Sequence, residues 1–574
     1  MKKTIFSILL FLMVPGIFFA KAPVPTIDNI ALEAPKVYYF AANGNDHNSG
    51  LSPDVPLKSS GKFNMLASST LNPGDSVLFK AGDTFNVGGW TNYMTITRSG
   101  RANAPITISS YGDGPRPVLS GMNTIPISGF VSEGSNIWTL TGAQQSSRWW
   151  KDGFEQVAAN TKESLSPSLT WYRSGTTLSV YSTSNPDRHW TTYGAQNGLR
   201  LMNCSYVHVR GLEIREVEYY AVPLRNANHC VIAHNKIAGY GNSAVQLAIN
   251  QGTTDTTQIT SFNEIAYNDI NSEFMWAYEK NMNYSKSGVI EGINIGCAAQ
   301  DNWVHHNTME WNYHAGVGGY NNTRACKPTA RNVIEYNTID GKNSWYARGA
   351  GMGGDINLNH YNIFRFNIIK NCTIRSQING DHNYWYGNIW MTGGLSKVYP
   401  DRSQHVQFQE WSEPSTVSRY NIFAHNVLDG AYDVGLISYS PTIEGNEVRN
   451  NIFINNAYGK GSNAQVLVGQ SSPDIGATVW RNNIFYSDSS RKVINYHGNL
   501  MELAVAQSLY PTEFSNNTNE DPHLNTDYSL KAGSLAKGAG IPIDSIIMDA
   551  NGAEKQKKNA KFIKRNVPPN VLNK

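Results

Sequence analysis

Residues 333–388 carry one short motif three times. The three copies are Tyr336-Asn337-Thr338-Ile339, Phe366-Asn367-Ile368-Ile369 and Gly387-Asn388-Ile389-Trp390. Each copy is a short β-prone run with an Asn just before its apolar centre. The repetition indicates that one structural unit is used several times along this part of the chain.

The same motif recurs along most of the 574 residues, at intervals of 21 to 39 residues. Its Asn stands at positions 235, 268, 307, 337, 367, 388, 426, 451, 483 and 517. A period in this range predicts a solenoid, in which each unit buries its apolar face only by stacking on its neighbours. The units are rich in Ile, Val, Phe, Tyr and Thr and lack long amphipathic runs of helical period, so we expect strands.

Parallel strands in successive coils would place equivalent residues above one another at about 4.7–4.9 Å. An Asn at a coil corner tolerates left-handed backbone angles, and stacked Asn amides can hydrogen-bond from coil to coil. The repeat resembles that of the right-handed parallel β-helix of the pectate-lyase-like superfamily. The resemblance implies an all-β solenoid over residues 101–540, and it specifies a fold rather than a reaction.

The two ends of the chain have signals of their own. In residues 1–22, two Lys precede an apolar run that ends in small residues, which predicts a signal peptide and a secreted or periplasmic protein. No Cys follows that run to carry a lipid, and no later apolar run is long enough to span a membrane. Residues 23–100 resemble the N-terminal cap of secreted β-helix proteins, with Asp46 and Asp75 expected in turns. Residues 541–574 are expected to form an exit segment and a basic tail.

The composition excludes some partners. A net charge of +3 with 16% charged residues offers no strong field for nucleic acid or a membrane. The five Cys residues lack metal-type spacing, and we expect buried free thiols. Residues 125–200 break the repeat and predict a small β insertion rich in Trp. Its Trp residues could stack on sugars or form an aromatic core, which is the commoner use of Trp. They are Trp138, Trp149, Trp150, Trp171 and Trp190.

Carboxylates recur at one position when the inter-Asn strands are aligned on their inward apolar residues. The aligned residues are Val317, Met352 and Ile378, followed three positions later by Tyr320, Asp355 and Asp381. By the two-residue period of a strand, an odd offset from an inward residue points outward. The next coil offers Glu410 two positions after Phe408, which fits only if that strand ends or bulges first.

Asp355, Asp381 and Glu410 would then line one outer face, about 5 Å apart between neighbouring coils. Like charges this close cannot all ionise freely, so at least one pKa should rise. A protonated acid beside an ionised carboxylate is what glycoside hydrolysis needs, with separations of about 5–5.5 Å for retention and about 6.5–9.5 Å for inversion. We predict that these three residues are catalytic.

Aromatic and basic side chains surround the same positions in the sequence. Rings offer apolar faces to sugars, and His or Arg can bond hydroxyls or acidic groups. The predicted substrate-binding residues are Tyr320, Trp345, Arg348, His360, His382, Trp385 and Trp411. Weaker candidates for the border of the cleft are Glu273, Glu279 and Glu291, from a coil with a long loop.

The preferred prediction is a monomeric glycoside hydrolase that cleaves a polysaccharide or oligosaccharide without a cofactor or metal. One alternative is a calcium-assisted polysaccharide lyase acting by β-elimination on a uronate-containing glycan, since calcium takes several carboxylate and amide oxygens. Its candidate bases are Arg348, Lys370, Arg375 and Lys397. The other alternative is a non-catalytic glycan-binding or surface adhesion protein.

Overall fold

The computed structural model describes residues 34–122, 127–143, 146, 149–152, 154–192, 194–250, 255–271, 291–311, 315–319, 327–343, 350–352, 359–395, 403–408, 418–438, 443–460, 464–469 and 478–539. The chain divides into two units, Met1–Pro35 and Lys36–Lys574, and every element named here belongs to the second. The predicted signal peptide at 1–22 and the tail at 541–574 lie outside the described residues. Among those residues, no helix is both long and apolar enough to cross a membrane.

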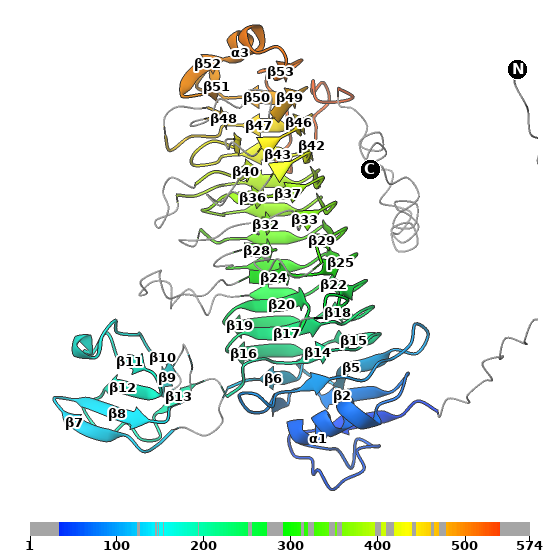
Figure 1. Ribbon diagram of the computed structural model, residues 1–574, viewed down its shortest axis with the longest axis vertical. Coiled ribbons are helices and arrows are strands. Elements are labelled where there is room, and N and C mark those ends of the chain that lie inside the picture. Colours follow the sequence, from blue (N-terminus) through cyan, green and yellow to red (C-terminus); the bar gives the residue numbers. More distant parts are fainter. Residues whose placement is uncertain are drawn as a thin grey trace, which may run out of the picture. The chain divides into compact units, whose positions relative to one another are not determined.

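Within the described residues, four stacks of short parallel strands form the solenoid (Figure 1). Sheet A contains β1 (Val37–Phe40), β2 (Ser76–Lys80), β5 (Ile106–Tyr111), β15 (Val207–Arg210), β18 (Val231–Ala233), β22 (Glu264–Ala266), β26 (Trp303–His305), β30 (Val333–Glu335), β34 (Ile363–Arg365), β38 (Tyr384–Tyr386), β42 (Ile422–Ala424), β46 (Asn446–Arg449), β49 (Thr478–Arg481) and β53 (Phe514–Ser515). Sheet B contains β3 (Thr84–Asn86), β6 (Val118–Ser120), β16 (Glu213–Val217), β19 (Lys236–Tyr240), β23 (Asp269–Asn271), β27 (Thr308–Glu310), β31 (Thr338–Asp340), β35 (Ile368–Lys370), β39 (Ile389–Met391), β43 (Val427–Asp429), β47 (Ile452–Ile454) and β50 (Ile484–Tyr486).

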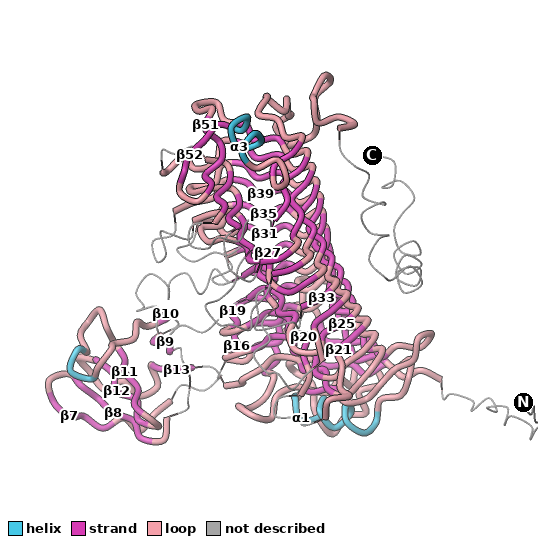
Figure 2. The backbone as a smooth tube through the Cα atoms, turned by 45° about the horizontal axis from the view of Figure 1, so that its top comes forward, coloured by secondary structure: helices cyan, strands magenta, loops and turns pink. Residues whose placement is uncertain are grey.

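Two further sheets complete each coil. Sheet C contains β4 (Thr95–Ile96), β14 (Arg200–Met202), β17 (Tyr220–Arg225), β20 (Ser243–Ala248), β24 (Glu291–Ile295), β28 (Ala315–Gly318), β32 (Ala350–Met352), β36 (Ser376–Ile378), β40 (Val406–Phe408), β44 (Leu436–Ser438), β48 (Val466–Val468), β51 (Lys492–Tyr496) and the antiparallel β52 (Asn499–Glu502). Sheet D contains β21 (Thr260–Ser261), β25 (Ala299–Gln300), β29 (Thr329–Ala330), β33 (Asn359–His360), β37 (Gly380–Asp381), β41 (Ser418–Arg419) and β45 (Ile443–Glu444). A complete coil passes through C, D, A and B in turn, which confirms the predicted parallel β-helix. Figure 2 shows β27, β31, β35 and β39 of sheet B stacked along the solenoid.

The core of the solenoid is built by in-register stacking of inward side chains. In sheet A, Phe364 pairs with Trp385, and Trp385 with Phe423. All three side chains are buried, and the first two rings stack with centroids 4.4 Å apart. Each coil therefore buries its apolar side chains against the coil above and the coil below, as a solenoid requires.

The recurring Asn forms a continuous ladder at the corner between sheets A and B. From Asn235 to Asn517, each Asn donates its Nδ2 to the Oδ1 of the Asn in the next coil, at 2.9–3.2 Å. All ten members are buried. This first ladder confirms the predicted coil-to-coil hydrogen bonding.

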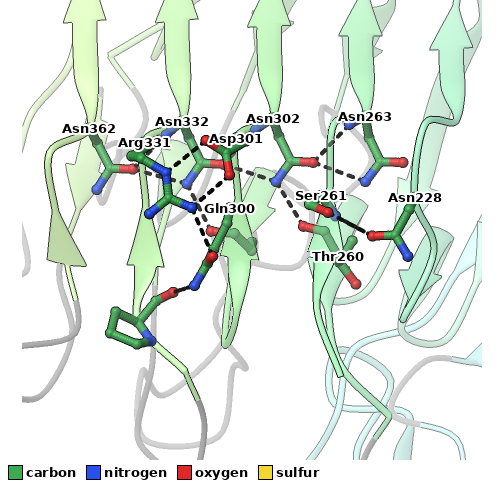
Figure 3. Close-up of polar contacts among 12 residues, drawn as sticks. Asn228, Thr260, Ser261, Asn263, Gln300, Asp301, Asn302, Arg331, Asn332 and Asn362 are labelled. Atoms are coloured by element: carbon green, nitrogen blue, oxygen red, sulfur yellow. Dashed lines mark hydrogen bonds and ion pairs between the residues drawn. The ribbon is translucent and has the colours of Figure 1, made fainter. Parts of the chain in front are cut away.

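A second ladder, which the sequence analysis missed, lies at the corner between sheets D and A. Its members are Asn263, Asn302, Asn332, Asn362, Asn383, Asn421 and Asn446, joined at 2.9–3.1 Å. Asn263, Asn302, Asn332 and Asn362 lie in a row in Figure 3. Each stands five residues before a member of the first ladder, so an Asn pair at that spacing was the available signal.

The left-handed backbone belongs to the residue before each Asn, which corrects the expectation that the Asn itself adopts it. At the first ladder these residues include Tyr267 and Tyr336, with φ of 55° and 54°. Their side chains form a stack on the outer corner, with centroids 4.9–5.2 Å apart and planes within 24°. The stacked side chains are His234, Tyr267, His306, Tyr336 and Phe366.

Short helices lie at both ends of the solenoid. At the N-terminal end, α1 (Ser60–Met65) continues into a π-helical turn, Leu66–Thr70, and its Phe63 packs on Phe40 and Phe79. Asp75 accepts hydrogen bonds from the backbone N–H groups of Lys36 and Asn72, so it is a turn residue as expected. Asp46 does the same for two other N–H groups. At the C-terminal end, α3 covers Leu503–Leu509.

Two antiparallel sheets interrupt the solenoid between β6 and β14. One contains β7 (Val131–Gly134), β8 (Ile137–Thr141), β11 (Trp171–Ser174) and β12 (Thr177–Tyr181), and the other contains β9 (Trp149–Lys151), β10 (Phe154–Glu155) and β13 (Trp190–Thr192). A short 3-10 helix covers Lys162–Ser164. Trp149, Trp171 and Trp190 are buried together in this region, so these rings are aromatic core.

The thiols follow the expectation in part. Cys204, Cys230 and Cys372 are buried free thiols, as predicted. Cys297 is disulfide-bonded, so the expectation of free thiols was wrong for this residue. A disulfide crosslinks the chain covalently, whereas the three free thiols act as small apolar side chains of the interior.

Replacing Asn367 with Ala should destabilise the fold by about 2–4 kcal/mol, because the backbone N–H of Asn337 loses its Oδ1 acceptor inside the core. Denaturant unfolding followed by circular dichroism measures the loss. The control is the exposed Asn519→Ala, which should stay within about 0.5 kcal/mol of the unaltered protein. Equal stability of the two variants would show that the ladder hydrogen bonds do not contribute to the free energy of unfolding.

His405 should make stability depend on pH. Burial lowers its pKa from the ordinary 6.5 to about 4, and its Nε2 lies 2.8 Å from the Asp429 carbonyl oxygen. The unfolded chain then binds a proton that the folded chain excludes, so stability should be lost as pH falls from 6.5 towards 4, by roughly 3 kcal/mol. His405→Gln should flatten this part of a stability–pH curve. The exposed His523→Gln should leave the curve unchanged.

Candidate functional site

The two edges of sheet C are where the coils vary in length. At the ladder corners only two residues separate consecutive strands, as between β25 and β26 or β26 and β27. Before and after sheet C the connections are longer, with nine residues between β31 and β32 and nine between β40 and β41. Long loops of a solenoid collect on its binding side, so the outer face of sheet C is the candidate site.

The predicted register in sheet C holds for three of its strands. Met352 pairs with Ile378, and Ile378 with Phe408, as the alignment requires. Val317 instead pairs with Ala350, two residues from the position predicted. Glycines alternate with the apolar residues in β28 and β32, so few side chains were available to set the register from the sequence. The predicted pairing of Val317 with Met352, from which Tyr320 was aligned with the two Asp residues, is therefore wrong.

Asp381 lies in sheet D rather than in sheet C. Its strand partners are His360 in the preceding coil and Arg419 in the following one, so it does not stack in register with Asp355 as predicted. Between Ile378 and Asp381 the chain turns at Gly380, whose φ is +88°, and a Cβ there would collide with the backbone of β33. The turn ends the two-residue alternation on which the alignment relied. The Asn379-Gly380 pair was a turn signal in the sequence.

Two imidazoles surround the Asp381 carboxylate. His360 Nδ1 contacts Oδ1, and His382 Nδ1 lies 3.4 Å from Oδ2. The three side chains are 18–31% exposed, although the Asp381 Oδ1 and His382 Nδ1 atoms themselves are shielded from solvent. Burial, together with the positive charge of Arg419, lowers the pKa of His382. The His382 imidazole therefore stays neutral near neutral pH, and a neutral imidazole can accept or donate a proton beside the Asp381 carboxyl group.

His382 also belongs to a ring stack at the second ladder. Its ring lies between Tyr361 and Tyr420, with centroids 5.1 and 5.2 Å away. Both of its faces are covered, so a sugar could meet only the edge of the ring. Sequence reasoning placed His382 near Asp381 correctly, but it did not foresee that the ring supports the coil corner.

Trp385 was predicted to bind substrate from a loop, and this is wrong. It is the central residue of β38, it is 1% exposed, and it packs inside the solenoid against Phe364. In a strand of three residues the central side chain points to the face opposite its two neighbours. The other predicted residues lie outside the described part of the chain. They are Asp355, Glu410, Tyr320, Trp345, Arg348 and Trp411.

A polar chain on the outer face of sheet C was not predicted as a unit. Arg225 Nη2 donates to Gln246 Oε1, Gln246 Nε2 to Asn294 Oδ1 at 3.4 Å, and Asn294 Nδ2 to Glu291 Oε2. Gln246 and Asn294 alternate with buried apolar residues, so the strand period was the signal that marks them as outward.

The Glu291 carboxylate lies where a side chain of Gly318 would stand, because a Cβ there would collide with it. The glycine thus leaves room on the outer face for the carboxylate of the preceding coil. Glu291 is 1% exposed, so its carboxylate is held away from bulk water by the polar chain and its surroundings. Among the described residues, no group of three or more His, Cys, Asp or Glu is placed to hold a metal ion.

No protein-family model matches the chain. The chain is 26% identical over 491 residues to a lacto-N-biosidase of Bifidobacterium longum subsp. longum, an alignment covering 79% of this chain and 29% of that protein. The chain thus spans less than a third of the length of this curated relative.

Two solved structures are similar at low sequence identity. A GH136 lacto-N-biosidase from Eubacterium ramulus is 16% identical with a TM-score of 0.39, covering 80% of this chain and 68% of that one. The pectate lyase Pel9A is 15% identical with a TM-score of 0.38, covering 88% and 91%. The stacked parallel sheets of this chain form a parallel β-helix.

Arg419→Gln should raise the pKa of His382 towards its ordinary value, because the substitution removes a neighbouring positive charge. The pKa should remain below the ordinary value, since burial persists. Titration of the His ring protons by NMR measures the change. His229, whose pKa is lowered by burial alone, is the internal control and should not move. An unchanged His382 titration would show that Arg419 does not act on this cluster.

Proposed function

We propose that the protein is a glycoside hydrolase that cleaves a polysaccharide or oligosaccharide bound at the outer face of sheet C, near its edge with sheet D. The observation that carries the proposal is the partly exposed Asp381 carboxyl group, which lies against two imidazoles at the end of the shortest connection between these sheets. A carboxylate in this setting can serve as a nucleophile or as an acid–base group.

Hydrolysis needs a second carboxylate, and the register of sheet C supports two candidates. Met352 and Phe408 pair with Ile378 from the strands on either side of it. Neighbouring strands lie about 4.8 Å apart. Asp355 follows Met352 by three residues and Glu410 follows Phe408 by two, so each starts from a coil next to that of Asp381. We propose that one acts with Asp381, with the imidazoles of His360 and His382 orienting the carboxylate and bonding sugar hydroxyls.

The similarity to a lacto-N-biosidase supports hydrolysis over β-elimination for this chain. Because the alignment covers 29% of that relative, the sugar and linkage that the relative cleaves are not carried over. The proposed substrate is therefore a glycan, met outside the cell if the predicted signal peptide directs export.

The test is incubation of the protein with a panel of plant, algal and host glycans. A hydrolase releases reducing ends without the ultraviolet absorbance of an unsaturated uronate, whereas a lyase produces that absorbance. Asp381→Asn should lower kcat by about 10²–10⁴-fold, because proton transfer or nucleophilic attack is lost. Asp355→Asn should have an effect of the same order if Asp355 is the second carboxylate.

The matched control is Asp269→Asn, an exposed aspartate on sheet B. Its turnover should equal that of the unaltered protein. Full hydrolytic turnover in both Asp381→Asn and Asp355→Asn would contradict the site, and unsaturated products would contradict hydrolysis itself.

A further inference from the structure

The first-ladder corner changes character in the last coils. In earlier coils its outward side chains are rings that stack on one another. In four later coils the same positions, each in left-handed conformation, are taken by one imidazole and three amides. These residues are His425, Asn450, Asn482 and Asn516. Amides do not fill a corner as stacked rings do, so this stretch has room that the earlier coils lack.

Residues 521–539, here called the C-terminal strap, close over that stretch. Tyr528 anchors the strap, because its Oη donates to Asp429 Oδ2 on β43 at 2.7 Å. Between the strap and the corner lies a cavity of about 320 Å³. Its walls include the four corner side chains on one side and Tyr528, Leu530, Leu535, Ala536 and Ala539 on the other.

The corner wall has unused hydrogen-bonding capacity. Asn450 Nδ2 is bonded to His425 Nε2 at 3.1 Å, but Asn450 Oδ1 is shielded from solvent and has no hydrogen-bond partner. The side chains of Asn482 and Asn516 make no hydrogen bond in the described structure. Asn482 is half-buried and Asn516 is exposed, so their free amides can meet the hydroxyls of a guest in the cavity.

The chemistry of the two walls indicates which class of ligand the cavity would bind. Amides both donate and accept, which matches the vicinal hydroxyls of a sugar. Leu530 and Leu535 offer apolar surface to the C–H face of a sugar ring, and the lining includes no Lys, Arg, Asp or Glu. The volume lies at the small end of ligand pockets, about 300–1,000 Å³. We propose that this cavity binds one neutral sugar unit, at a second glycan site separate from sheet C.

The corner joins sheets A and B, so the cavity shares no strand with the proposed catalytic face. A sugar unit bound there would keep a glycan on the protein without being cleaved. The inference rests on the cavity alone and stands whether or not sheet C carries a hydrolase.

The test is binding of D-glucose, D-galactose, D-mannose, N-acetyl-D-glucosamine and D-glucuronate to the full chain, by saturation-transfer NMR and isothermal titration. Asn482→Gly removes one amide while keeping the left-handed backbone free of strain, and Ala536→Phe fills the cavity from the strap. Each should weaken binding of a neutral sugar by about tenfold or more. Asn455→Gly, an amide with left-handed φ outside the cavity, should not.

Failure of every neutral sugar to bind the unaltered protein would overturn the inference and leave the cavity to water. Unchanged affinity in both Asn482→Gly and Ala536→Phe would overturn it too, as would glucuronate binding as tightly as the neutral sugars. Thermal melting of each variant separates loss of binding from loss of fold. Because the readout is binding, these results are distinct from the cleavage results for sheet C.

Discussion

The amide-to-amide hydrogen bonds at the two ladder corners are the constraint on which the rest of the structure depends. Each Asn of the ladders is buried and bonded to the equivalent Asn above and below, so neither corner can gain or lose a residue without leaving polar groups unpaired in the core. From β18 to β42, every strand of sheet A thereby has three residues. Within the coils that carry both ladders, the large differences in connection length fall at the two edges of sheet C, and that is where the candidate site lies.

The same corners explain how many of the aromatic residues are used. The left-handed residue before each Asn points its side chain outward. Rings in successive coils then stack face to face, with ring centroids about 5 Å apart. Rings in these stacks cannot offer a face to a sugar, although the aromatic content of the sequence suggests sugar binding. Where the rings give way to amides, the outer corner becomes a hydrogen-bonding wall, and the strap closes a cavity against it.

The fold could be predicted from the sequence because successive coils repeat the same motif. One recurring Asn predicted the first ladder, and apolar anchors predicted the pairing of Met352, Ile378 and Phe408. It failed where the repeat is interrupted. Glycines removed the side chains that would have fixed Val317, and the turn at Gly380 moved Asp381 into another sheet. Trp385 was misplaced because a Trp beside His and Asp reads as a binding residue until its strand position shows that it points inward.

The most direct measurement of the central claim is a crystal structure of the Asp381→Asn protein with an uncleaved oligosaccharide bound. The account predicts that the glycan lies across the outer face of sheet C, with a glycosidic oxygen within hydrogen-bonding reach of the side chain at 381 and of a second carboxylate from a neighbouring coil. A glycan bound only elsewhere, with residue 381 out of reach of every linkage, would contradict it.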